Sequence, residues 1–212
     1  MNSFETDLFR AITSKGFVIG LVLELAVLMT AGMNSELFRV CVPVLCTLPY
    51  STAWLVEYHS GFVKNCLPRT SITSYILGKI LACGISGGLL EVAGAWIFTL
   101  LYPLVKEGDA PSCQFLLLFL SGMLWAVLSA LLAAWSNNRY IAYGGSFVIY
   151  YLLVILHERY FKQLYCLYPY EWFAPSHTWI FDEQGIVLLL AGIILILIYF
   201  YYKILRRCIE RV

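Results

Sequence analysis

Two acidic residues lie inside long apolar runs of this sequence, where ionisable side chains are rare. Glu24 interrupts a run that begins at Gly16, and Glu91 interrupts a glycine-rich run that begins at Tyr75. A carboxylate inside a lipid bilayer is unfavourable unless it is paired or hydrated. We therefore expect one of two roles for this pair. The residues either line a translocation pathway or bind a cationic substrate group, or they are hydrogen-bonded or protonated at a helix or subunit interface.

A serine in the same glycine-rich run has the surroundings of a nucleophile. Residues 84–87 read Gly-Ile-Ser-Gly, which matches a pattern seen in rhomboid-type membrane proteases. A serine nucleophile needs a base beside it, but His59, His157 and His177 all lie outside the apolar runs. The main interpretation is therefore that small residues allow close helix packing. An intramembrane serine protease that uses Ser86 is the alternative.

The most polar stretch in the first half of the chain connects two apolar runs. It covers residues 57–79, reads EYHSGFVKNCLPRTSITSYILGK, and contains the basic residues Lys64, Arg69 and Lys79. Charged residues make up only 13% of the chain, compared with about 25% in a soluble domain. We therefore expect this stretch to be presented to a partner. A basic loop also helps to fix the orientation of a membrane protein.

The composition and the absence of certain motifs exclude several classes of function. The chain is 61% hydrophobic, and several apolar runs approach the roughly 20 residues that cross a bilayer. The net charge is +1, with no dense basic cluster, so we expect membrane lipid and not nucleic acid around it. No Cys-x-x-Cys pair and no G-x-x-x-x-G-K-[ST] loop occurs. We therefore expect no metal site, no ATP site and no cofactor in this chain.

The apolar runs predict an all-α integral membrane protein with six transmembrane helices. The spans are expected at residues 16–33, 37–56, 75–105, 113–135, 141–156 and 186–202. Pro43 and Pro49 fall inside the second span, where neighbouring groups can satisfy the carbonyls that proline leaves free.

Two segments outside the spans are expected to lie at the membrane surface. Residues 1–15 place apolar side chains at helical spacing between charged ones, which predicts an N-terminal interfacial helix. Residues 157–185 form an aromatic connector before the last span. We expect re-entrant helices in this connector. Tyr168, Trp172 and Trp179 are its candidate gate residues.

Basic residues are distributed unevenly across this six-span topology. If both termini face the cytoplasm, ten of the 14 Lys and Arg residues lie on that side, as the positive-inside rule requires. They are Arg10, Lys15, Lys64, Arg69, Lys79, Arg139, Lys203, Arg206, Arg207 and Arg211, whereas Arg39, Lys106, Arg159 and Lys162 lie outside. The 57–79 stretch is then cytoplasmic and the aromatic connector is extracellular.

With this predicted topology, the chain resembles an ABC-2 type permease, the membrane subunit of an ABC exporter, over its whole length. The shared features are six spans with both ends inside, an N-terminal interfacial helix, a basic loop after span two and an aromatic re-entrant segment before span six. Within the loop, Lys64-Asn65, Arg69-Thr70-Ser71 and Gly78-Lys79 are similar to the family's pattern.

The resemblance implies a single permease domain, residues 1–212, in a bacterial cell membrane. It implies that residues 57–74 are a cytoplasmic coupling segment that docks on a separate ATPase subunit, which binds ATP and Mg. Glu57, Lys64, Asn65 and Arg69 would lie at or near that interface. A second permease copy or paralogue would complete a pathway formed mainly by spans one, two and five. The lack of a large extracellular domain favours export of a peptide, drug or other amphipathic small cargo.

A third class of function is consistent with the same sequence. The chain would then be a non-catalytic membrane protein with an immunity or assembly role, without a transport pathway and without a partner ATPase.

Overall fold

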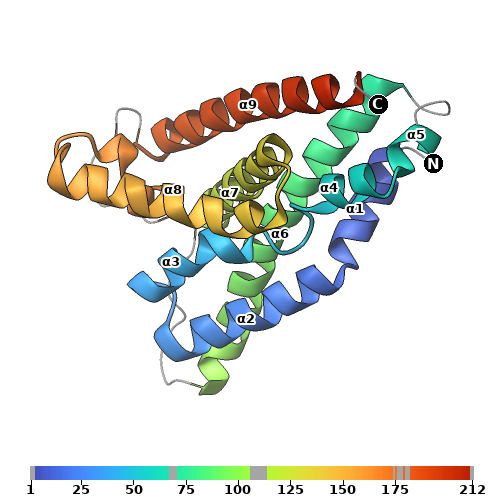
Figure 1. Ribbon diagram of the computed structural model, residues 1–212. Coiled ribbons are helices and arrows are strands. Elements are labelled where there is room, and N and C mark those ends of the chain that lie inside the picture. The colour runs from blue at the N-terminus through green and yellow to red at the C-terminus, as the bar shows by residue number, and fades with distance from the viewer. Residues whose placement is uncertain are drawn as a thin grey trace.

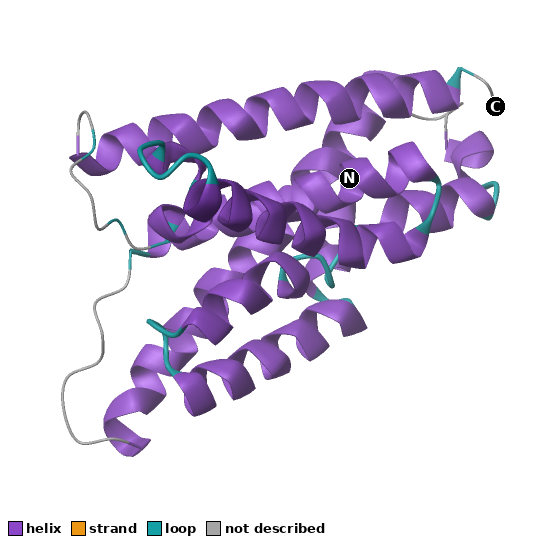
Figure 2. Ribbon diagram, turned by 60° about the vertical axis from the view of Figure 1, so that its left-hand side comes forward, coloured by secondary structure: helices purple, strands orange, loops and turns teal. Residues whose placement is uncertain are grey.

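The computed structural model describes residues 3–66, 71–105, 114–173, 175, 179 and 182–210. These residues form helices joined by turns, and no strand occurs among them (Figure 2). The helices are α1 (Ser3–Ile12), α2 (Lys15–Ala31), α3 (Glu36–Leu45), α4 (Ala53–His59), α5 (Phe62–Cys66), α6 (Ile72–Val105), α7 (Phe115–Ser136), α8 (Arg139–Arg159) and α9 (Asp182–Ile209). Two short 3-10 helices, η1 (Tyr165–Leu167) and η2 (Pro169–Trp172), lie between α8 and α9.

The centre of the molecule is the pair formed by α6 and α7. Helices α1, α2 and α9 contact α6, and α8 and α9 contact α7. Figure 1 shows α2 on one side of this central pair and α9 on the opposite side.

Four helices, α6 to α9, are long and apolar enough to cross a membrane. Helices α1 and α2 meet at a bend of 46°, and together they would make a fifth span. The predicted class, an all-helical multi-pass membrane protein, agrees with this arrangement. The predicted number of six spans is not confirmed.

Serine caps fix the first two turns between the N-terminal helices. The Ser14 hydroxyl accepts a hydrogen bond from the Phe17 amide at 3.0 Å, and Ser35 does the same for Phe38 at 3.2 Å. Such caps satisfy amide groups that have no partner within the helix. Between them, Gly32 ends α2 with a φ of 86°, a conformation that favours glycine.

The segment predicted as the second span, residues 37–56, is not one helix. Helix α3 ends at Leu45, the chain passes through consecutive turns over residues 46–52, and α4 begins at Ala53. Proline explains the break, because Pro43 lies inside α3 and Pro49 has no amide hydrogen to continue it. Ten residues of helix cover about 15 Å, roughly half of a bilayer core.

Glycines allow α6 and α7 to pack closely, as the 84–87 pattern predicted. A Cβ atom at Gly87 would lie 2.5 Å from the Cβ atom of Ala126, and one at Gly88 would lie 2.6 Å from the Phe119 carbonyl oxygen. Both distances are too short for real side chains. The close approach of these helices therefore depends on glycine at both positions.

Candidate functional site

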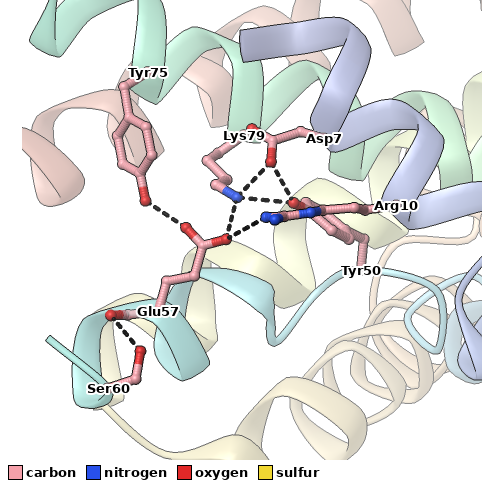
Figure 3. A network of polar contacts seen from close by, with 7 residues as sticks. All are labelled: Asp7, Arg10, Tyr50, Glu57, Ser60, Tyr75 and Lys79. Carbon is pink, nitrogen blue, oxygen red and sulfur yellow. Dashed lines mark hydrogen bonds and ion pairs between the residues drawn. The ribbon is translucent and has the colours of Figure 1, made fainter. Parts of the chain in front are cut away.

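A buried ion cluster joins four segments that are distant in the sequence (Figure 3). The ammonium group of Lys79, on α6, donates hydrogen bonds to Asp7 Oδ1 of α1 at 2.7 Å and to Glu57 Oε1 of α4 at 2.6 Å. It also donates to the hydroxyl of Tyr50, in the turn between α3 and α4, at 2.8 Å. Only 2% of the Lys79 side chain is exposed. Such a buried charge is tolerated because oppositely charged groups surround it.

Three further contacts complete the cluster. The Tyr50 hydroxyl donates to Asp7 Oδ1 at 2.9 Å, and the Tyr75 hydroxyl donates to Glu57 Oε2. The Arg10 guanidinium lies 3.7 Å from Glu57 Oε1. The two carboxylates thus balance the two basic groups in formal charge. We call this group the Lys79 cluster; its members are Asp7, Arg10, Tyr50, Glu57, Tyr75 and Lys79.

The Lys79 cluster changes the interpretation of the polar stretch 57–79. The expectation that Lys79 belongs to a presented surface is wrong, because the residue lies inside α6 and is buried. Glu57 is 14% exposed and its carboxylate is occupied by Lys79. Sequence reasoning missed Asp7 as a partner, since 72 residues separate it from Lys79.

The remaining predicted coupling residues lie on or after α5. Lys64 is exposed on this short helix. Asn65 belongs to the same helix, and its side chain is outside the described part of the chain, as is the whole of Arg69. The predicted contact of Glu57, Lys64, Asn65 and Arg69 with an ATPase subunit stays a prediction.

The two intramembrane acids lie in the helix bundle, each packed against glycine. Glu24 and Glu91 are fully buried, and none of their carboxyl oxygens has a hydrogen-bond partner within the described residues. A Cβ atom at Gly94, one turn after Glu91 on α6, would overlap the Glu24 carboxyl group. A Cβ atom at Gly122 of α7 would lie 2.8 Å from Glu91 Cγ. The structure thus brings the predicted pair to one region, between α2, α6 and α7.

Two of the three candidate gate residues, Trp172 and Trp179, are buried. Trp172 stacks on Trp125 of α7 with ring centroids 5.9 Å apart, and its indole N–H donates to the Cys166 carbonyl at 3.1 Å. The Trp179 indole N–H donates to Glu171 Oε2 at 3.4 Å. The role of both tryptophans as a gate stays a prediction.

Tyr168, the third candidate gate residue, is partly exposed. Its ring stacks on His157 at 4.3 Å and meets the Tyr170 ring edge-on at 4.7 Å. Burial raises the pKa of the Tyr168 and Tyr170 hydroxyls, so both stay neutral at physiological pH. Between the end of α8 and the start of α9, the described part of this connector contains the 3-10 helices η1 and η2, and the predicted re-entrant helices are not confirmed.

Ser86 is buried and its hydroxyl donates to the Cys83 carbonyl of the same helix at 3.0 Å. No hydrogen bond joins it to either described histidine, His59 or His157. The geometry is that of a packing residue in a transmembrane helix.

No protein-family model, no curated protein and no solved structure matches this chain.

Proposed function

We propose that this chain is the membrane-spanning permease subunit of an ATP-driven ABC exporter, energised by separate ATPase subunits. The observation that carries the proposal is the attachment of α4 to α6 through the buried pair of Glu57 and Lys79. A turn at Ser60 and Gly61 joins α4 to the short helix α5, on which Lys64 is exposed. A force on α5 would therefore be passed through α4 and the Glu57–Lys79 pair to the central helix α6.

The position of Glu91 on α6 extends this connection to the centre of the bundle. Lys79 and Glu91 are twelve residues apart on one helix, which corresponds to about 18 Å. Because α6 contacts α1, α2, α7 and α9, a displacement of its first turns would disturb the packing around Glu24 and Glu91. These two acids are the candidate pathway residues.

The location of α5 fits a cytoplasmic face shared with the chain termini. Val63 of α5 and Ile209 of α9 belong to one apolar cluster, and α1, α5 and the last turns of α9 lie at the same end of the molecule in Figure 1. We place this end in the cytoplasm and the aromatic connector outside. In this proposal, α1 is the interfacial helix, α2 forms the first span, and α3 with its following turns forms the second.

A second permease copy or paralogue would cover the open side of the molecule. Only 22% of the most apolar stretch of α8 is buried inside the molecule, and the same share holds for α9. Val148 and Tyr151 on α8 are more than half exposed. Such apolar faces suit lipid or another membrane subunit. ATP and Mg would bind to the ATPase subunits, and the cargo would be a peptide, a drug or another amphipathic small molecule.

The test is co-expression of this chain with ABC ATPases encoded by neighbouring genes, followed by affinity purification. We expect the ATPase to co-purify, and we expect Lys64→Glu combined with Arg69→Glu to lose it or to uncouple ATP hydrolysis from transport. Lys162→Glu, in the connector, is the matched control and should retain both. A monomeric chain that recruits no ATPase would contradict the proposal, as would normal assembly and transport in the double variant.

A further inference from the structure

The strongest unexplained feature of the molecule is a pair of buried carboxyl groups without partners. Glu24 and Glu91 have no exposed surface, and all four of their carboxyl oxygens lack a hydrogen-bond partner among the described residues. An ionised carboxylate in such surroundings is strongly unfavourable, and the group takes up a proton instead. Two carboxylates near one another disfavour ionisation further.

Basic residues on the surrounding helices are engaged elsewhere or lie far along the chain. Lys79 of α6 is bound to Asp7 and Glu57, and the Arg39 guanidinium of α3 lies over the Tyr170 ring at 5.2 Å from its centroid. On α2, the only basic residue is Lys15, nine residues and about 14 Å before the buried acid. Helix α7 has no charged residue. The described surroundings therefore supply no cation to this pair.

Three free cysteines lie on the neighbouring helices: Cys41 on α3, Cys46 at its end and Cys83 on α6. Thiols are neutral at physiological pH unless a positive group stabilises the thiolate. They add no charge that would keep the carboxyl groups ionised.

The helices are shaped around the two acids. Gly94 leaves the space that the Glu24 carboxyl group occupies, and Gly122 does the same for the side chain of Glu91. Any larger residue at these positions would collide with the acids. This close fit favours the smallest ligand, a proton.

We propose that Glu24 and Glu91 form a proton-binding site between α2, α6 and α7. Each carboxyl group holds a proton while the helices are packed as in this structure. When the helices separate and water enters, the carboxyl O–H bond breaks, the proton passes to water and a carboxylate remains. The inference rests on the packing of this chain alone and does not depend on the proposed transport function.

The test is infrared spectroscopy of the purified chain in lipid nanodiscs, over a series of pH values in water and in deuterium oxide. A protonated carboxyl group has a C=O stretching band that an ionised one lacks, and this band shifts on deuteration. In the unmodified protein we expect the band to be present at pH 7, where exposed carboxyl groups have lost it. Absence of the band at pH 7 in folded protein would overturn the proposal.

Substitutions assign the band to the two residues. Glutamine has the size of a neutral glutamic acid, so Glu24→Gln and Glu91→Gln should each remove part of the band, and the double variant all of it. Glu158→Gln, at an exposed position on α8, is the control and should leave the band intact. A band that survives in the double variant would overturn the proposal. So would its loss from the unmodified protein on adding sodium, potassium, magnesium or calcium ions at constant pH, which would identify a metal-cation site.

Discussion

Lys79 shows how far a single residue can depart from the role that its sequence neighbours suggest. It follows a polar, basic stretch, yet it lies in α6 and binds carboxylates from α1 and α4. Sequence spacing indicated a helix here but carried no sign of Asp7, because the two carboxylates come from separate helices, α1 and α4, that are distant in the sequence. Glu57 was predicted to lie near an ATPase subunit, which stays a prediction; in the structure its carboxylate contacts Lys79.

Removing the charge of Lys79 is expected to destabilise the protein. Lys79→Met would leave the buried carboxylate of Asp7 and the partly buried carboxylate of Glu57 without their central partner, which costs about 3–5 kcal/mol. Thermal unfolding in detergent measures the effect. Lys64→Met, at an exposed position, should change stability by no more than about 0.5 kcal/mol.

The same cluster offers a rescue experiment. Combining Lys79→Met with Asp7→Asn and Glu57→Gln removes the uncompensated charges, so the triple variant should recover most of the lost stability. If Lys79→Met unfolds at the same temperature as the unmodified chain, the ion cluster does not hold α1 and α4 on α6.

At the scale of the elements, apolar run length located the long helices well. Residues 75–105 and 113–135 were predicted as spans, and α6 and α7 begin and end within three residues of these limits. The runs are long, continuous and uncharged or nearly so, which leaves few alternatives. Residues 37–56 do not form the one continuous helix that their hydrophobicity suggested, because hydrophobicity cannot distinguish a kinked helix from one that stops. Here Pro43 and Pro49 stop it.

The packing of α6 on α7 predicts opposite effects for the same substitution at two glycines. Gly87→Ala should destabilise the protein by about 1–3 kcal/mol, because the new methyl group would collide with Ala126. Gly144→Ala on α8 has no atom within 4 Å of the new methyl group, and it should be neutral or stabilising by up to about 1 kcal/mol. Comparison of the two unfolding temperatures checks this. Equal effects would show that α6 and α7 are not in close contact at Gly87.

At the scale of the whole molecule, the sequence predicted the all-helical class of the protein, whereas the arrangement of the helices came from the structure. The orientation in the membrane stays a prediction. The acids Glu24 and Glu91 were found by their apolar surroundings, but only the fold shows that both lie against glycines of α6 and α7. The candidate gate residues were singled out by their aromatic character. The stacking of Trp172 depends on Trp125, which comes from a helix distant in the sequence.

The proposed orientation predicts which side of the membrane each polar segment faces. In a chain whose seven cysteines are replaced by alanine, Lys64→Cys should react with a membrane-impermeant maleimide only after the cytoplasmic side is opened. Lys162→Cys should react in intact cells, and the cysteine-free chain should not react at all. Reaction of both sites from the same side would contradict the six-span topology.

The central claim is that α5 docks on an ATPase subunit, and photo-crosslinking tests it most directly. A photoreactive amino acid at position 64 is incorporated in cells that co-express the neighbouring ATPase, and position 162 serves as the control. We expect irradiation to give a cross-linked product that contains this chain and the ATPase from position 64 alone. Absence of that product from position 64 in a chain that is inserted normally, or its formation from position 162 instead, would contradict the proposed function.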